Sequence, residues 1–449
     1  MKFHITTFGC QMNVHDSEWL ARALESRGWE AVGENEAQVY ILNTCSVREK
    51  PEQKVYSELG RIAAHLRRDP SVFAAVGGCV AQQVGQGFFD RFPHVRLVFG
   101  SDGIAGAPGA LERIARGEDD RVALLDFIPT YEEREQPEAR TSAAPGTRQA
   151  FVNIMQGCDN FCSYCIVPYT RGRQKSRHPD AVVAECRALA RAGVREITLL
   201  GQNVNSFGQD KGGVGVSFAD LLYRVAGIDG LDRLRFTTSH PKDIAPEVIA
   251  AFGELENLCP ALHLPLQSGS DAVLGNMRRK YDRQRYLGIV DALREARPDI
   301  VLTTDLIVGF PGETEADFQD TLEMVERVGY ESSFSFKYSD RPGVAAVGME
   351  PKVDPKVAGE RLTRLQALQN SITRKCLKSL EGLETDVFIE GLSRVQGDGP
   401  TWWKGRDPAG RIVNVSLSEG DGLAGMMVPV RIIEAKKHSL LGEKAGSPW

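Results

Sequence analysis

Three cysteines stand close together in the middle of the chain, at Cys158, Cys162 and Cys165, with three residues between the first pair and two between the second. When three thiolates hold a cube of four irons, one iron stays open to a ligand from outside the protein. A closed electron carrier or a structural zinc site normally has four protein ligands. The spacing therefore predicts a reactive iron–sulfur cluster.

Two other interpretations of these thiols remain open from the spacing alone. His178 could complete a zinc site as the fourth ligand, or the thiols could pack as small apolar side chains. Residues 151–155 are rich in β-branched and aromatic side chains and precede Gly157, so they predict a strand that runs into a loop. A loop can bring three closely spaced thiols together around one cluster.

Three further cysteines, Cys10, Cys45 and Cys79, each follow a predicted strand in the N-terminal region. These strands alternate with amphipathic helices, which predicts parallel strands joined by right-handed crossovers. Because the carboxyl ends of such strands share the edge where open α/β folds bind ligands, we expect the thiols to meet there in a second three-thiolate cluster. Without that common position, cysteines so far apart in sequence would be read as packing residues. The predicted strands are 2–8, 39–43 and 72–76, and the predicted helices are 17–26 and 47–66.

The composition is that of an ordinary soluble enzyme, with 42% hydrophobic and 25% charged residues in 449 positions, enough for two or three domains. The net charge of −6 gives no overall electrostatic case for nucleic-acid binding. An N-terminus without a secretion segment, and no long apolar stretch, predict a cytoplasmic protein that is not bound to a membrane. In that reducing compartment, nine cysteines favour metal or redox chemistry over disulfides.

The pattern predicts an α/β protein of three domains. Residues 1–128 form an N-terminal open parallel α/β sheet domain, and the polar residues 129–148 form a linker. Residues 149–376 alternate strands and helices, which predicts an open or partial (β/α) barrel, with the cysteine loop at the face where barrel active sites lie. Residues 377–449, with short strands and glycine-rich turns, predict a small β-barrel. The predicted strands from residue 197 onward are 197–200, 234–238, 261–264, 302–308, 333–338, 386–390, 412–415 and 428–435; the predicted helices are 179–192, 281–296 and 315–328.

Four separated segments resemble the radical S-adenosylmethionine (SAM) methylthiotransferases. They are residues 157–172 around the cysteine loop, and residues 77–79, 264–270 and 309–314. The resemblance spans almost the whole chain and includes a TRAM-like C-terminal domain. Residues 236–241, Phe-Thr-Thr-Ser-His-Pro, are similar to the subgroup that modifies isopentenyladenosine in tRNA, the MiaB subgroup.

This resemblance implies a division of labour between two [4Fe-4S] clusters. SAM would bind the open iron of the Cys158, Cys162, Cys165 cluster and be cleaved by one electron, and the resulting radical would abstract hydrogen from carbon-2 of the modified adenine beside the anticodon. Sulfur would come from or through the cluster of Cys10, Cys45 and Cys79, with a methyl group from a second SAM. A flavodoxin or ferredoxin would supply the electron, and an unidentified donor the sulfur.

Polar residues at other strand ends are candidates for SAM binding, although each could equally be a solvated loop residue. They are Gln202, Asn203, Gln267, Ser268 and Asp305. Thr314 is predicted to cap the helix that follows it. Residues 340–345 depart from the family pattern, so we expect a changed loop there. Cys186, Cys259 and Cys376 are interpreted as packing residues.

Two groups of basic residues could meet RNA. Trp402, Trp403, Lys404, Arg406 and Arg411 form an aromatic and cationic group that could bind bases and phosphates, or else pack in the small barrel with solvated arginines. The second group, Arg171, Arg173, Lys175 and Arg177, is placed to meet phosphate near the active site, or could keep an exposed strand edge soluble.

Other functions remain compatible with these patterns. The same chemistry could act on threonylcarbamoyladenosine in tRNA or on an aspartate of a ribosomal protein. A protein that uses its clusters only for folding, as an iron–sulfur scaffold or RNA-binding protein, would leave SAM uncleaved. The three-cysteine spacing argues against that last class.

Overall fold

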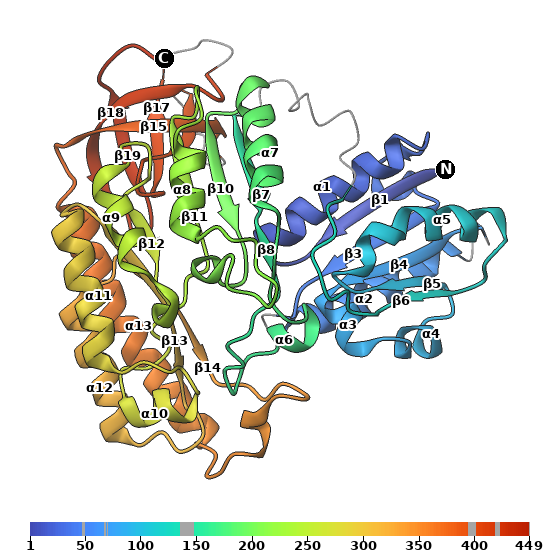
Figure 1. Cartoon of the computed structure of the whole chain (residues 1–449), viewed down its shortest axis with the longest axis horizontal. Helices are drawn as coiled ribbons and strands as arrows, with labels where there is room; N and C mark the ends of the chain where they lie inside the picture. Colours follow the sequence, from blue (N-terminus) through green and yellow to red (C-terminus); the bar gives the residue numbers. More distant parts are fainter. Residues whose placement is uncertain are drawn as a thin grey trace.

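The computed structural model describes residues 1–46, 50–66, 69, 71–134, 148–393, 401–417 and 423–448. An N-terminal α/β domain, a central α/β domain and a C-terminal β-barrel follow one another along the chain (Figure 1). Most of the predicted linker, residues 135–147, lies outside the described residues. No helix in the described part is both long and apolar enough to cross a membrane.

The N-terminal sheet is parallel throughout its described strands, in the order β2-β1-β3-β4-β5-β6. β1, β3 and β4, the strands that precede the three cysteines, are neighbours in it. Helices cover both faces, with α1 and α5 on one side and α2, α3 and α4 on the other. The predicted parallel arrangement is confirmed. The strands are β1 (Lys2–Thr7), β2 (Glu30–Ala31), β3 (Val39–Thr44), β4 (Phe73–Gly78), β5 (Val95–Phe99) and β6 (Val122–Leu124), and the helices are α1 (Gln11–Glu25), α2 (Lys50–Leu66), α3 (Cys79–Val84), α4 (Gly87–Arg91) and α5 (Ala107–Arg116).

Helix α1 starts earlier than the apolar pattern predicts. It begins at Gln11, directly after Cys10, whereas the apolar face starts only near Ser17. The first two turns instead bury the polar residues Asn13, His15 and Asp16 against the central domain. Hydrophobic periodicity misses such turns because their buried side chains are polar.

The central domain is an open half-barrel of parallel strands. The described strands of the half-barrel itself form two sheets, β7-β10-β11 and β12-β13-β14. Residues 257–259 join the sheets, since Leu234 donates to Asn257 O and Cys259 donates to Leu234 O. The predicted partial barrel is confirmed. The strands are β7 (Gln149–Asn153), β10 (Glu196–Leu200), β11 (Arg233–Phe236), β12 (Ala261–His263), β13 (Val301–Val308) and β14 (Ser332–Lys337).

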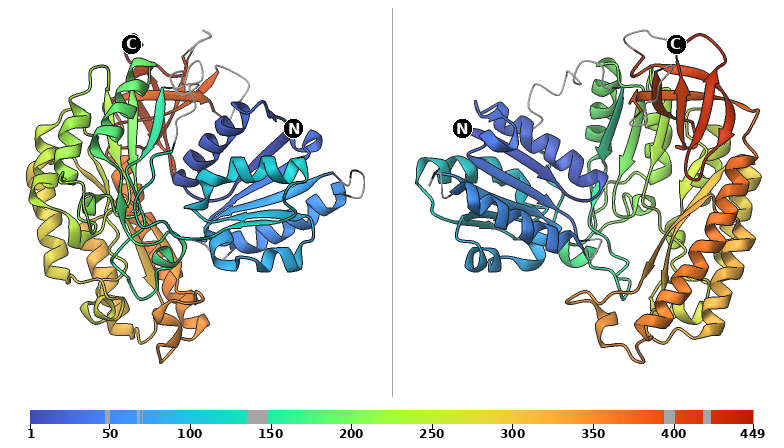
Figure 2. Two further views of the ribbon diagram at one scale, coloured as in Figure 1. Left: turned by 45° about the vertical axis from the view of Figure 1, so that its right-hand side comes forward. Right: turned by 180° about the vertical axis from the view of Figure 1, so that it is seen from behind.

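Helices cover the outer face of this half-barrel over one continuous apolar core (Figure 2). The predicted cap of α12 is present: Thr314 Oγ1 accepts from Asp317 N at 3.2 Å, and the Asp317 carboxylate accepts from Thr314 N at 2.8 Å. Cys186 and Cys259 are buried, as expected for packing residues, and Cys376 is half-buried. The helices are α6 (Val167–Thr170), α7 (Pro179–Arg191), α8 (Phe218–Ala226), α9 (Pro246–Glu254), α10 (Asp271–Asn276), α11 (Arg283–Ala296), α12 (Glu315–Val328) and α13 (Pro355–Lys378).

The C-terminal strands close into a barrel in the order β15-β16-β17-β19-β18, within the described residues. This confirms the predicted small β-barrel. It packs against the amino ends of the central strands, where Arg233 donates to Arg406 O and Asp386 O at 3.0 and 2.7 Å. The cysteine loop is at the opposite, carboxyl end (Figure 1). The strands are β15 (Glu384–Leu392), β16 (Trp402–Arg406), β17 (Ile412–Ser416), β18 (Met427–Ala435) and β19 (Leu440–Lys444).

Candidate active site

The three-cysteine loop leaves the short ladder of β8 (Met155–Gln156) and β9 (Lys175–Ser176). Gly157 opens the loop at a φ of +79°, and a Cβ there would stand 2.1 Å from Arg173 O. Only glycine fits such a position. On its far side the loop is held by Ser163, which donates from N to Met277 O at 3.0 Å and from Oγ to Asn276 O at 2.8 Å.

The loop thiols lie close enough to influence one another electrostatically, with Cys162 buried and Cys158 and Cys165 half-buried. Burial raises the pKa of Cys158 to about 11 and that of Cys165 to about 12, and the negative charge of Cys162 adds to both shifts. Thiols that influence one another in this way need a bound cation to ionise together. In the described part of the chain, no three His, Cys, Asp or Glu side chains are grouped as ligands of one metal ion. Three thiols whose charges act on one another match the donor set of a [4Fe-4S] cluster in which each thiolate binds a different iron.

Two buried side chains contact the Cys162 sulfur. Arg279 Nη1 donates to Cys162 Sγ at 3.4 Å, and its Nη2 donates to Pro265 O at 3.1 Å. His240 Nε2 lies 3.9 Å from the same sulfur. Burial and the nearby Arg279 lower the pKa of His240, so its ring is neutral. Because His240 Nδ1 accepts from Lys242 N, the ring proton is on Nε2 and points toward Cys162.

Of the candidate SAM residues, Gln202 and Asn203 follow β10 beside the cysteine loop. Gln202 Oε1 accepts from Gly157 N at 2.6 Å, and its Nε2 contacts Met12 Sδ of the N-terminal domain. Asn203 donates to Asp243 Oδ2 at 2.7 Å. Gln202 thus holds the loop in place. Asn203 Oδ1 is buried without a partner in the described residues.

Two residues absent from the sequence prediction share this property. Asn205 and Ser239 are 2% and 4% exposed, and their side-chain polar atoms have no hydrogen-bond partner among the described residues. Both lie in loops that follow neighbouring strands, β10 and β11. Unpaired buried polar atoms are costly unless a ligand satisfies them, so these two positions are further candidates for ligand contacts. The one signal in the sequence that could have predicted them is that both residues belong to polar segments that follow strands.

Gln267, Ser268 and Asp305 come from the other half of the barrel. Gln267 has a φ of +72°, its N donates to Asp305 O and its O accepts from Ile307 N, both at 2.8 Å. Asp305 lies 3.3 Å from His263 Nε2 and remains about one-third exposed. Ser268 is fully buried against Thr321 on α12, which favours a structural role.

The N-terminal thiols meet at the carboxyl ends of β1, β3 and β4, as predicted from the strand order. Gly9 precedes Cys10 at a φ of +121°, and a Cβ there would lie 2.2 Å from Cys45 Cβ. A hydrogen bond from the Cys45 thiol and the positive charge of Arg171 lower the pKa of Cys10 to about 5. This site therefore favours a thiolate where the loop site favours neutral thiols.

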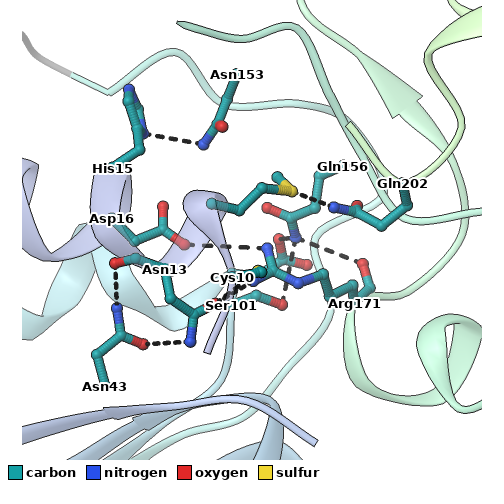
Figure 3. Close-up of polar contacts among 12 residues, drawn as sticks. Cys10, Asn13, His15, Asp16, Asn43, Ser101, Asn153, Gln156, Arg171 and Gln202 are labelled. Carbon is teal, nitrogen blue, oxygen red and sulfur yellow. Dashed lines mark hydrogen bonds and ion pairs between the residues drawn. The ribbon is translucent and has the colours of Figure 1, made fainter. Parts of the chain in front are cut away.

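Arg171, from the central domain, enters this N-terminal site (Figure 3). Its Nη2 donates to Asn13 Oδ1 at 2.8 Å, its Nη1 lies 3.9 Å from Asp16 Oδ2, and its guanidinium lies beside Cys79 and raises no charge conflict with a thiolate there. Its side chain is only 5% exposed. Two domains thus build one site.

Further buried contacts hold the two domains together. Lys175 pairs with Asp102, whose Oδ1 also accepts from Gln156 Nε2 at 2.6 Å. Asn153 Nδ2 lies 3.0 Å from His15 Nδ1 (Figure 3). The N-terminal domain therefore packs directly beside the cysteine loop.

Two family profiles match the chain. The Radical SAM superfamily matches residues 152–325, which include the cysteine loop and most of the half-barrel. A family described as uncharacterized protein family UPF0004 matches residues 2–100, which include the three N-terminal cysteines.

Relatives match over their full length. A protein of Nitratidesulfovibrio vulgaris named tRNA-2-methylthio-N(6)-dimethylallyladenosine synthase is 60% identical over 447 residues, covering 100% of this chain and 99% of the relative. Proteins of the same name from Lawsonia intracellularis and Geobacter metallireducens are 51% and 48% identical, with 98% of each chain covered. The chain belongs to this family of radical SAM enzymes, the MiaB family.

Solved structures of other radical SAM enzymes share the fold. The methyltransferase TsrM from Kitasatospora setae matches with a TM-score of 0.59 and 14% identity, covering 83% of this chain and 89% of that one. The cobalamin-dependent enzyme OxsB matches with a TM-score of 0.55 and 10% identity, covering 83% of this chain and 57% of that one. At such identities the likeness concerns the fold alone.

The zinc and packing interpretations give way in a radical SAM enzyme, which binds SAM and a [4Fe-4S] cluster. His178, the zinc candidate, instead caps α7, where its Nδ1 accepts from Asp180 N at 3.3 Å. The loop over 340–345, where the sequence departs from the family pattern, leads into a short 3₁₀ turn, η6 (Ala345–Gly348), which reaches the cysteine loop. There Ala346 donates to Ser163 O at 2.8 Å.

Neither interpretation of the second basic group survives for three of its four members in this MiaB-family chain. Arg171, Lys175 and Arg177 are each 4% exposed, so they line neither a phosphate site nor an open strand edge. Arg177 pairs with Glu133 and Glu185 at 2.6 and 2.7 Å. Only Arg173 of this group is exposed. Alternating spacing did not reveal that Arg171 and Lys175 face a second domain, or that Arg177 is buried between Glu133 and Glu185.

In the C-terminal barrel the cations have acidic partners. Lys404 and Arg406 both pair with Glu390, at 2.7 and 2.6 Å. Arg411 pairs with Asp407 and with Glu331 of the central domain, so it joins the two domains. Trp403 packs against the barrel core.

Proposed function

We propose that this chain transfers a methylthio group to carbon-2 of isopentenyladenosine beside the anticodon of tRNA, with two [4Fe-4S] clusters and SAM. The observation that carries the proposal is the meeting of two three-cysteine sites at adjoining edges of two domains. The name shared by the full-length relatives supplies the substrate.

In this proposal, Cys158, Cys162 and Cys165 hold the cluster that binds SAM. When bound, that cluster supplies the electron that cleaves SAM. Arg279 and the Nε2 proton of His240 donate toward the Cys162 sulfur and stabilise its thiolate. Gln202 fixes the start of the loop through Gly157 N.

The second cluster is assigned to Cys10, Cys45 and Cys79, which would present sulfur to the substrate. Three protein ligands leave one iron free for an exogenous sulfur ligand. Gln202 contacts Met12, two residues after Cys10, and this supports a short path between the two sites. The proposed reaction requires a short path, because a radical generated at one site must react with sulfur held at the other.

Asn203, Gln267 and Asp305 remain our proposed SAM contacts, and Asn205 and Ser239 join them because their polar atoms are buried and unpaired within the described residues. Gln202 and Ser268 are assigned supporting positions, since their side chains already bond to Gly157 and Thr321.

The remaining assignments follow from the family chemistry. A flavodoxin or ferredoxin would reduce the clusters, and a separate donor would renew the sulfur. Residues 1–128, 149–376 and 377–449 would act as cluster, SAM and RNA-binding domains, with 129–148 as the linker. The enzyme would work in the cytoplasm, where its tRNA substrate is found.

The test is on anaerobically reconstituted protein, with iron and sulfide analysis followed by mass spectrometry of tRNA bearing isopentenyladenosine after incubation with SAM, sulfide and dithionite. We expect about eight irons per chain and one added methylthio group on that base. About four irons would refute the second cluster. Deoxyadenosine with unmodified tRNA would refute the substrate, and tRNA bearing threonylcarbamoyladenosine and the ribosomal protein would then be assayed in turn.

A further inference from the structure

Arg171 brings a buried positive charge from one domain into the cysteine site of the other. It follows α6, only six residues after the last cysteine of the loop. Its guanidinium nevertheless contacts Asn13 and Cys79 of the N-terminal domain. A buried arginine is costly unless it finds compensating negative charge. The question is which group supplies that charge.

The backbone of this segment is anchored to the N-terminal domain. Ser101 Oγ donates to Thr170 O at 3.1 Å, and Gln156 Nε2, which bonds to Asp102, lies 3.4 Å from Arg171 O. These contacts place the arginine side chain at the carboxyl edge of the N-terminal sheet (Figure 3). Its position therefore depends on the docking of the two domains.

Asp16 only partly compensates the charge of Arg171. The Asp16 carboxylate is engaged by Arg134, whose Nη1 donates to Oδ1 at 2.7 Å. Arg171 stands 3.9 Å from the other oxygen, beyond hydrogen-bond distance. One carboxylate thus faces two arginines, which leaves a net positive charge beside Cys10 and Cys79. Thiolates are the groups that would balance it.

We propose that Arg171 is a positioning residue for the N-terminal cluster, which it holds through N–H···S hydrogen bonds and whose reduction potential it raises when the two domains are docked. This inference rests on the two-cluster function proposed above. A positive charge and hydrogen bonds to cysteine sulfur stabilise the added electron of a reduced cluster. Removing them makes the cluster harder to reduce.

The experiment uses the full-length chain with Cys158, Cys162 and Cys165 replaced by alanine, so that only the N-terminal cluster is read. In this background Arg171→Gln removes the positive charge, and Arg171→Lys keeps the charge but lacks the planar guanidinium group. Arg173→Gln is the matched control. Arg173 is two residues away, with a side chain 72% exposed. Each reconstituted protein is analysed for iron and sulfide and titrated with dithionite and mediators, with the reduced cluster followed by electron paramagnetic resonance.

At the parent's midpoint potential, we expect Arg171→Gln to lower the ratio of reduced to oxidised cluster about tenfold, a shift of about 59 mV for one electron. Arg171→Lys should recover most of this shift, and Arg173→Gln should titrate like the parent. Iron loading by Arg171→Lys but not by Arg171→Gln would also support the proposal, because charge alone would rescue assembly.

Two results would overturn it. One is a loaded Arg171→Gln protein that titrates like the parent. The other is failure of both Arg171 variants to hold iron while Arg173→Gln holds it, since the arginine would then be needed for folding. A parent without iron would instead refute the N-terminal cluster itself, and the proposed function with it.

Discussion

The two three-cysteine sites have the same number of thiols but are built in opposite ways. The loop site takes its cysteines from eight consecutive residues, 158–165, and its arginine, Arg279, from the same domain. The N-terminal site takes its cysteines from the ends of three strands and its arginine from another domain. The first is therefore complete within one domain, whereas the second is complete only when two domains are docked.

The two sites also differ in how their surroundings shift the pKa values of their cysteines. Burial raises the pKa of Cys158 and Cys165, while Cys45 and Arg171 lower the pKa of Cys10. Each site has one arginine, but Arg279 does not outweigh the burial of Cys158 and Cys165, whereas Cys45 and Arg171 outweigh the burial of Cys10. We therefore expect the two sites to respond differently to the same kinds of substitution.

The largest effect should come from removing one set of cysteines at a time. Alanine at 158, 162 and 165 should abolish SAM cleavage and leave about four irons, because only the N-terminal cluster remains. Alanine at 10, 45 and 79 should also leave about four irons, retain deoxyadenosine formation and abolish methylthio transfer. Iron analysis and mass spectrometry of nucleoside and tRNA products measure both. Equal loss of cleavage in the two variants would contradict the division of labour.

Arg279→Gln should slow SAM cleavage by roughly 10- to 100-fold, the usual effect of removing a group that supports a metal ligand. The cause is the loss of the charged donor to Cys162 Sγ. The rate of deoxyadenosine formation measures it. Arg278→Gln, the exposed neighbour, is the control. Equal rates for both variants would show that Arg279 is not a support of the loop site.

The domain interface should be sensitive to Asp102→Asn. Asp102 and Lys175 have side chains only 5% and 6% exposed, so the substitution leaves an uncompensated buried lysine. We expect a loss of about 3–5 kcal/mol in the free energy of unfolding, measured by urea titration. Asp119→Asn, in the exposed pair with Arg113, should cost less than about 1 kcal/mol. A small effect at Asp102 would mean that the interface is held mainly by other contacts.

The smallest effect concerns tRNA binding. Arg173 is the exposed member of the basic group, so Arg173→Gln should weaken tRNA binding modestly and reduce the slope of log K against log salt by about one. Filter binding at several salt concentrations measures this. Unchanged affinity and slope would remove Arg173 from the RNA surface.

The structure could be predicted from the sequence wherever the local residue pattern and the strand topology lead to the same conclusion. Strand ends predict the meeting of Cys10, Cys45 and Cys79, because parallel neighbours share an edge. The sequence was insufficient at the domain interface, where the polar start of α1 and the side chains of Arg171 and Lys175 are buried against another domain. Periodicity describes how an element meets its own core, and it contains no information about a second domain that covers the same element. Asn205 and Ser239 were missed because nothing in a polar loop residue's type shows that it is buried.

The C-terminal barrel and the cysteine loop lie at opposite ends of the central strands. This separation sets the distance that an RNA would have to span in order to contact both. Strand β13 has eight residues and spans about 26 Å at 3.3 Å per residue. An RNA bound by the barrel would have to extend over roughly that length before its modified base reached the loop. A free nucleoside is far too short to do so. If the barrel binds the tRNA, as proposed above, the architecture favours a stem-loop over an isolated nucleoside, because only the longer molecule can contact the barrel and the loop at the same time.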